Sequence, residues 1–216
     1  MSCRYERVFW DWNGTLLDDV EVCIESMNEL LGEYSLPPLE SLERYHSVFG
    51  FPVSSYYERL GFDFSKVPFE RTGMEFIEKY DRRQKRAGLA QGAEEALGRL
   101  RSAGLKQAVL SASERGALRA QIEERGITEY FCDILGIGDR LAGGKADIAR
   151  RYFEENGIDP ARAVFIGDTS HDYEVARSLG CECILVAGGH QSRSALEALA
   201  GRAAVSLSQA ADWVLG

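Results

Sequence analysis

Short apolar runs that alternate with helical patterns are the feature that most restricts the fold of this chain. Each run has the length and composition of a buried strand, and from residue 91 onward a helical pattern separates one run from the next. Such alternation predicts an α/β fold with a Rossmann-like parallel sheet, right-handed crossovers and helices on both faces. The expected strands are Tyr5 to Trp10, Lys106 to Leu110, Asp133 to Ile137, Ala163 to Ile166 and Glu182 to Val186.

The segment between the first two strands shows only helical spacing. A first helix is indicated there by an apolar face, with Asp18 or Asp19 as its candidate cap. That face comprises Val20, Ile24, Met27, Leu30 and Leu31, and further helices are expected at 39–48, 54–60 and 69–86. We therefore predict an α/β core of residues 1–18 and 88–216, with an all-helical cap of residues 19–87 inserted after the first strand.

Composition argues against several kinds of partner. Lys and Arg number 25 against 34 Asp and Glu, so a net charge of -9 gives no overall attraction to nucleic acid or an anionic membrane. A secretory signal pattern and a membrane-spanning apolar stretch are both absent from the sequence. The five cysteines form no Cys-x-x-Cys pair and make a poor zinc set with the three histidines. We expect a cytoplasmic monomer or homodimer whose cysteines act as small apolar residues.

Polar residues follow four of the expected strands. They are Asp11 to Thr15, Ser111 to Ser113, Lys145 after a glycine-rich loop, and Asp168 to Asp172. The carboxyl ends of parallel strands meet at one edge of a sheet, where ligands bind near the switch in strand order. We therefore expect these side chains to lie together.

The residue types at this edge suit phosphoryl transfer, which needs a nucleophile, positive charge for the phosphate oxygens and a metal. Asp11 is placed to attack phosphorus and form an aspartyl-phosphate. The hydroxyl of Ser111 and the charge of Lys145 suit the phosphate oxygens. Further phosphate donors are expected from the backbone at Trp12, Gly14 and Ala112.

A metal site is expected at the same edge. The carboxylates of Asp11 and Asp168 and the backbone carbonyl of Asn13 are hard oxygen ligands that suit Mg²⁺. Asp172 lies one helical turn beyond Asp168, so it can face the same site and hold metal-bound water.

Two other ligand-binding motifs fail. A Walker A loop needs glycine where Asp139 stands and Ser or Thr where Ala146 stands. The Gly-Ile-Gly sequence that begins at Gly136 lacks the third glycine and the later acidic residue of a dinucleotide site. His171 and His190 are expected to be surface or supporting residues rather than catalysts.

Together these segments closely resemble the haloacid dehalogenase superfamily, most nearly its phosphoglycolate-phosphatase-like hydrolases with a helical cap. The four superfamily motifs match, in order, FWDWNGTLLDD, AVLSAS, GGKADIAR and GDTSHD. The resemblance covers nearly the whole chain. It implies a Mg²⁺-dependent phosphatase acting on a small phosphorylated metabolite, with Asp11, Asn13, Ser111 and Lys145 at the catalytic positions.

Asn13 departs from the superfamily pattern D-x-D-G-T. In the superfamily's phosphatases the second acid protonates the leaving oxygen and later activates water, which an amide cannot do. Three functions stay open: a phosphatase with a good leaving group or another acid, a phosphotransferase or mutase, and a weak phosphate-binding protein. An engineered substitution would also explain Asn13. If the acid is the only missing part, Asn13→Asp should raise alkyl phosphate hydrolysis by up to ~10²–10⁴-fold.

The cap is expected to close over the site, exclude water and select the substrate. Phosphoglycolate, a sugar phosphate and a nucleotide are all compatible with the sequence. The candidate contacts for a second anionic group are Arg44, His46, Arg59, Lys66 and Arg71.

Overall fold

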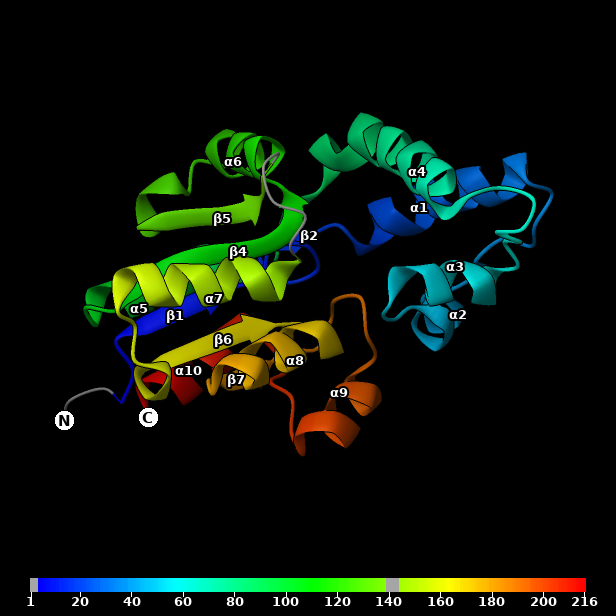
Figure 1. Cartoon of the computed structure of the whole chain (residues 1–216). Helices are drawn as coiled ribbons and strands as arrows, with labels where there is room; N and C mark the ends of the chain where they lie inside the picture. The colour runs from blue at the N-terminus through cyan, green and yellow to red at the C-terminus, as the bar shows by residue number, and fades with distance from the viewer. Residues whose placement is uncertain (1–3, 139–143) are drawn as a thin grey trace.

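A five-stranded parallel sheet forms the centre of the computed structural model, which describes residues 4–138 and 144–216. The strand order is β5-β4-β1-β6-β7, so the N-terminal strand lies in the middle (Figure 1). This confirms the predicted fold class. The strands are β1 (Arg7–Trp10), β4 (Lys106–Glu114), β5 (Asp133–Ile137), β6 (Ala163–Gly167) and β7 (Glu182–Leu185).

The register of the three central strands aligns their carboxyl ends. Trp10 lies opposite Val109 of β4 and Ile166 of β6. The backbone N–H of Asp11 then donates to the carbonyl of Ile166 at 2.8 Å, which extends this alignment past the end of β1. Residues that follow these strands therefore arrive at one edge of the sheet.

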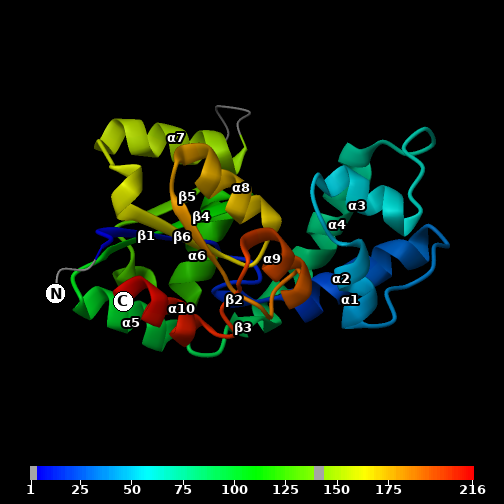
Figure 2. The same cartoon turned by 90° about the horizontal axis from the view of Figure 1, so that it is seen from below.

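Side chains of the sheet alternate between two apolar cores, one on each face. Val8 and Trp10 of β1 belong to one core and Phe9 to the other, as the two-residue period of a strand requires. Figure 2 shows α5 and α10 on one side of the sheet and α7 and α8 on the other. The first core includes α5 (Ala93–Ser102), α6 (Arg115–Glu124) and α10 (Leu207–Leu215); the second includes α7 (Lys145–Asn156) and α8 (Ser170–Leu179). The remaining elements of this part are α9 (Arg193–Ala200) and short 3₁₀ turns at Thr128–Tyr130 and Pro160–Arg162.

Four helices lie beyond the carboxyl edge of the sheet (Figure 1). They are α1 (Val20–Glu33), α2 (Leu42–Val48), α3 (Val53–Leu60) and α4 (Phe69–Arg83), followed by a 3₁₀ turn at Gln84–Arg86. We call them the helical insertion. Its apolar core includes Leu30, Tyr45 and Tyr57. β2 (Leu17–Asp18) pairs antiparallel with β3 (Gly88–Leu89), so the chain enters and leaves the insertion side by side.

One local prediction was right only in position, and two were wrong. Asp19 occupies the N-cap position of α1, but its side chain makes no capping hydrogen bond. β4 continues through Glu114, so Ser111 lies inside the strand, and Glu114 caps the next helix. The second helix begins only at Leu42, where the Ser41 side chain caps it.

The cysteines follow their predicted role in part. Cys181 is buried and Cys183 is half-buried in the same apolar core, whereas Cys132 is exposed. Cys3 and Asp139 lie outside the described residues, as does part of the glycine-rich loop before Lys145.

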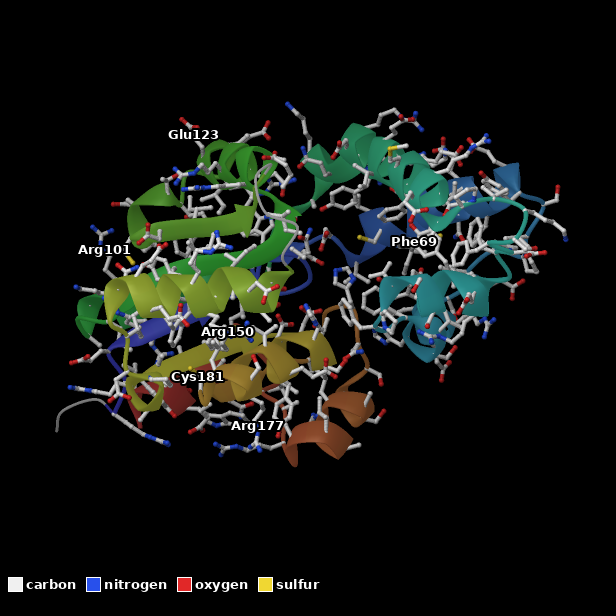
Figure 3. The ribbon with its side chains drawn as sticks, in the orientation of Figure 1. Phe69, Arg101, Glu123, Arg150, Arg177 and Cys181 are labelled. Atoms are coloured by element: carbon white, nitrogen blue, oxygen red, sulfur yellow. The ribbon has the colours of Figure 1, made fainter. Side chains whose placement is uncertain are left out.

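Charged side chains lie on the outer surface of the helices. Arg101, Glu123 and Arg150 are examples (Figure 3). Exposed ion pairs such as Arg101 with Glu129, at 2.9 Å, contribute little to stability. Within the described ranges, every helix is too short or too polar to cross a membrane.

Candidate active site

Three carboxylates converge at the carboxyl edge of the sheet. Asp11 follows β1, Asp168 follows β6, and Asp172 lies in the first turn of α8. Each offers an oxygen within 4.8 Å of an oxygen of the other two. Asp168 and Asp172 are buried, and the side chain of Asp11 is 12% exposed. The cluster thus consists of the hard oxygen ligands that Mg²⁺ prefers.

Lys145 lies between two of these carboxylates. Its Nζ is 2.5 Å from Oδ1 of Asp11 and 2.5 Å from Oδ1 of Asp172. Burial alone would lower the pKa of the ammonium, but the two anions raise it above its usual range. One cation does not balance three carboxylates, and burial together with Asp172 raises the pKa of Asp11 to about 8. A bound cation would lower that pKa, so both the charge and the ligand type fit a metal.

Asp168 is held in place from two loops. Thr15 Oγ1 donates to its Oδ1 at 2.8 Å, and the backbone N–H of His190 donates to its Oδ2 at 2.6 Å. A Cβ on Gly14 would lie 2.4 Å from Oδ2, and one on Gly189 would lie 2.1 Å from it. Gly14 also has a φ of 72°. Only glycine fits beside this carboxylate at both positions.

The oxygens of Asp172 and Asp11 differ in how many donors they have. In the capping box of α8, Asp172 Oδ2 accepts from the backbone N–H and hydroxyl of Thr169 at 3.1 and 2.6 Å. Its Oδ1 accepts from Lys145, so both oxygens are engaged. By contrast, among the described residues Asp11 Oδ2 has one long contact, at 3.4 Å, with Thr15 Oγ1. Asp11 therefore keeps an oxygen available for another partner.

The end of β4 brings hydroxyl groups to the same edge. Ser111 is buried, and its Oγ donates to Ser113 Oγ at 3.1 Å while accepting from the Ser113 backbone N–H at 3.1 Å. Ala112 is exposed beside them. The Trp12 side chain is buried and donates to Gln121 at 2.7 Å, so a ligand could meet only its backbone.

The side-chain amide of Asn13 is fully hydrogen-bonded. Its Nδ2 donates to Asp19 at 2.7 Å and to the Tyr80 hydroxyl at 2.9 Å, and its Oδ1 accepts from Ser113 at 3.0 Å. An amide bound in this way holds its neighbours in position and has no acidic proton to transfer.

Sequence reasoning missed the role of Asp19, which is fully buried. It accepts from the Gly14 backbone N–H at 2.8 Å and the Tyr80 hydroxyl at 2.7 Å, in addition to Asn13. Burial opposes its ionisation, but His190 and the other donors outweigh burial and lower the pKa of Asp19. The only sequence feature that could have drawn attention to Asp19 is that it is a second acidic residue directly after Asp18.

His190 lies between the sheet domain and the helical insertion. Its Nδ1 is 2.8 Å from the Tyr45 hydroxyl of α2, and its ring stacks on Phe49 with centroids 5.2 Å apart. Burial would lower its pKa, but Asp19 raises it to about 9.

Asp19, Cys23 and His190 lie close enough to share a metal. However, burial raises the pKa of the Cys23 thiol well above its usual range, and metal ligation requires deprotonated Cys and neutral His. This trio therefore fits a hydrogen-bond network better than a metal site.

We expect the protein to lose stability as the pH rises through about 9. A His with a raised folded pKa contributes stability that is fully present below its unfolded pKa, 6.5, and lost above its folded pKa. The loss is about 3 kcal/mol, at about 1.4 kcal/mol for each pKa unit between 6.5 and about 9. Denaturant unfolding at intervals between about pH 6 and pH 10 measures it, with His190→Gln as the comparison. The same pH slope in both proteins would contradict this assignment.

The five candidate contacts for a second anionic group are unevenly placed. His46 approaches the sheet domain, where its Nε2 is 3.0 Å from the Gly189 carbonyl. The other four side chains are exposed: Arg44, Arg59, Lys66 and Arg71. His171, in the first turn of α8, stacks on Phe51 of the insertion with ring centroids 4.8 Å apart. Histidines thus make core–insertion contacts near the carboxylate cluster.

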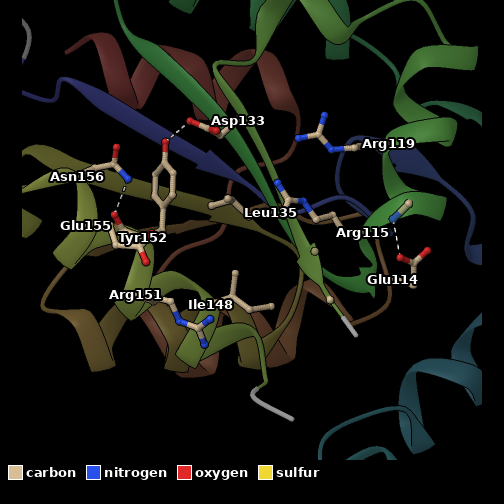
Figure 4. A pocket seen from close by; sticks show the side chains of 13 residues that line it. Glu114, Arg115, Arg119, Asp133, Leu135, Ile148, Arg151, Tyr152, Glu155 and Asn156 are labelled. Carbon is tan, nitrogen blue, oxygen red and sulfur yellow. Dashed lines mark hydrogen bonds between the residues drawn. The ribbon is translucent and has the colours of Figure 1, made fainter. Parts of the chain in front are cut away.

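A hollow among the described residues lies away from the carboxylate cluster. It has a volume of about 830 Å³ and runs along the edge strand β5, between α6 and α7 (Figure 4). Tyr152 donates to Asp133 at its wall. None of the clustered carboxylates lines this hollow, so its size does not identify the candidate site.

The cluster lies in the part of the chain that matches a known family. A family model described as haloacid dehalogenase-like hydrolase matches residues 8–186, which include all three carboxylates and Lys145. The chain belongs to this hydrolase family. Phosphoglycolate phosphatase from Chromobacterium violaceum is 27% identical over 89% of this chain and 90% of its own length. Tyrosine-protein kinase PtkA from Mycobacterium tuberculosis is 27% identical over 86% of this chain but 63% of its own length.

Solved structures share the fold of this haloacid dehalogenase-like hydrolase. A haloacid dehalogenase-like family protein from Streptococcus pneumoniae has a TM-score of 0.83 at 17% identity, covering 97% of this chain and 98% of that one. A predicted phosphatase from Clostridium acetobutylicum has a TM-score of 0.79 at 25% identity, covering 98% of each chain. The family makes the chain a hydrolase, and its sequence relatives place it with the phosphatases.

Proposed function

We propose that this hydrolase is a Mg²⁺-dependent phosphatase that acts on a small phosphorylated metabolite through an aspartyl-phosphate on Asp11. The observation that carries the proposal is the grouping of three carboxylates at the carboxyl edge of the sheet, two of which bind Lys145. An ammonium and a divalent cation together can balance the charge of a transferring phosphoryl group. Similarity to phosphoglycolate phosphatases supports a small substrate.

Each residue of the site has a proposed role. Asp11 Oδ2 attacks phosphorus, and the phosphorus–oxygen bond to the leaving group breaks. Lys145 and the Ser111 hydroxyl donate to the phosphoryl oxygens, and water then hydrolyses the aspartyl-phosphate to regenerate Asp11. Asp11, Asp168 and the Asn13 carbonyl would hold Mg²⁺, which would supply neutralising charge when bound.

We expect Mg²⁺ binding to depend more on Asp168 than on Asp172. Because both Asp172 oxygens already accept from Lys145 and Thr169, we expect this residue to hold metal-bound water. Asp172→Ala should weaken Mg²⁺ affinity by about 10–100-fold, the usual effect of a residue that supports a metal ligand, and Asp168→Ala by more. Calorimetric titration with Mg²⁺ measures both. Full activity after exhaustive chelation would rule out the metal requirement.

We propose that the helical insertion, residues 19–87, acts as a cap over a catalytic core of residues 1–18 and 88–216. The contacts of His46 with Gly189 and of Phe51 with His171 support this role, because they hold the insertion against a loop and the first turn of α8, both beside the carboxylates. A docked cap excludes water and selects substrates by shape and charge.

A screen of phosphorylated metabolites with Mg²⁺ tests the proposed function. Release of inorganic phosphate should be fastest for small phosphomonoesters, with phosphoglycolate among the first to examine. Binding without turnover of any compound would overturn the phosphatase proposal in favour of a phosphate-binding protein.

A phosphotransferase is the second candidate. The fully bonded Asn13 amide supports it, because a site without an acid–base carboxylate hydrolyses its phospho-enzyme slowly. The similarity to a tyrosine-protein kinase points the same way. Adding acceptor alcohols to the screen separates the two functions, since a phosphotransferase would yield a phosphorylated acceptor in place of inorganic phosphate.

A further inference from the structure

Asp19 connects three parts of the molecule through one buried network. Its oxygens accept from Asn13 Nδ2, the Gly14 backbone N–H and the Tyr80 hydroxyl at 2.7, 2.8 and 2.7 Å. They also face His190 Nε2 at 3.4 Å. These partners lie in the loop after β1, in α4 of the insertion and in the loop after β7. A fully buried carboxylate with this many donors is held as an anion in one position.

The chemistry of Asp19 restricts which residue can stand at position 13. An ionised carboxylate only accepts hydrogen bonds, so its partner must present an N–H or O–H group. Asn13 presents its amide N–H to Asp19, while Ser113 binds the amide oxygen. A carboxylate in place of that amide would lie about as close to Asp19 as the amide does, and two carboxylates so close cannot both be ionised.

We propose that Asp19 is a positioning residue that holds Asn13, and with it the loop carrying Asp11, when the helical insertion is docked. This proposal rests on the proposed phosphatase function. It leads to a different expectation for Asn13→Asp from the gain expected if the acid is the only missing part. With Asp19 in place, the single change should not add a working acid. Exchanging both residues, as Asn13→Asp with Asp19→Asn, keeps one carboxylate and one amide in contact.

Thermal unfolding of the single and double variants tests the contact without any assay of activity. Asn13→Asp should lower the Tm by on the order of 10 °C, because it opposes two buried carboxylates, and Asn13→Ala should lower it less. The exchanged double variant should have a higher Tm than Asn13→Asp alone. Asp18→Asn is the matched control for Asp19→Asn. It makes the same carboxylate-to-amide change at the exposed neighbouring position and should leave the Tm nearly unchanged.

Kinetics on paired alkyl and aryl phosphates test the positioning role. Asn13→Asp alone should give no rise in kcat/KM on either substrate. Relative to Asp19→Asn, the exchanged variant should gain at least about 10-fold on the alkyl phosphate and less on the aryl phosphate, because alkoxide leaving groups need a proton more. A purely structural contact would change both substrates equally.

Three results would overturn the proposal: additive Tm changes in the exchanged variant, Asn13→Asp as stable as Asn13→Ala, or a gain in alkyl phosphate hydrolysis from Asn13→Asp alone. If Asp19→Asn does not fold, the Tm values of Asn13→Asp and Asn13→Ala still show whether a carboxylate at position 13 is opposed by Asp19. If wild type hydrolyses no phosphate ester, the proposed function fails, and the Tm values still report whether Asp19 holds Asn13.

Discussion

Asp11→Asn is expected to lower turnover by about 10⁴-fold or more, because it removes the attacking oxygen on which the whole reaction depends. The amide is nearly the same size as the carboxylate, so packing around Lys145 should not change. The substitution also removes one of three clustered carboxyl groups that have a single cation among them. The metal-free variant should therefore be at least as stable as wild type.

Measuring both rate and stability separates a loss of catalysis in Asp11→Asn from a loss of folding. Phosphate release from the best substrate measures the rate, and denaturant unfolding without metal measures the stability. A large loss of turnover in a fully folded variant is the expected pair of results. Wild-type turnover by the variant would exclude Asp11 as the nucleophile, and a large loss of stability would mean that the charge balance described here is wrong.

Lys145→Met should damage both stability and catalysis. Lys145 is 4% exposed and binds Asp11 and Asp172, so its loss leaves uncompensated carboxylates in the interior. Breaking a buried pair in this way costs about 3–5 kcal/mol, and losing one stabilising charge at a phosphoryl group costs about 10²–10³-fold in kcat. The carboxyl pKa values would rise in the folded state, so the destabilisation should grow as the pH increases and these groups ionise.

Lys79→Met is the matched control for this substitution. Lys79 is also buried, but its partner Glu33 has a side chain that is 51% exposed and can be solvated after the change. Unfolding of both variants with and without Mg²⁺ should show a larger loss for Lys145→Met, partly restored by the metal. Equal losses, with no effect of Mg²⁺ on either, would contradict a cation site beside Lys145.

The meeting of Asp11 and Asp168 could be predicted from sequence because each directly follows a strand. Parallel strands in register deliver their next residues to one edge, and Trp10 lies opposite both Val109 and Ile166. Asp11 and Asp168 thus meet although their strands are far apart in the sequence. The end of β4 was harder to predict, because pairing of Glu114 with Ile137 of β5, rather than local propensity, extends the strand.

The network around Asp19 could not be predicted, because its partners meet only when the insertion packs on the sheet domain. Tyr80 follows Asp19 by 61 residues and comes from α4, and His190 comes from the loop after β7. Residues near Asp19 in the sequence favour a helix cap, which is a local role. In the structure Asp19 is instead buried among donors that are distant in the sequence, and sequence spacing does not predict such contacts.

Rapid quenching of the wild-type protein during turnover tests the central claim most directly. The protein is mixed with Mg²⁺ and its best substrate, stopped in acid, and its peptides are examined by mass spectrometry. We predict one phosphoryl group on Asp11 that forms before inorganic phosphate is released and is absent from Asp11→Asn. Steady turnover with Asp11 never phosphorylated, or with the phosphoryl group on another residue, would contradict the account.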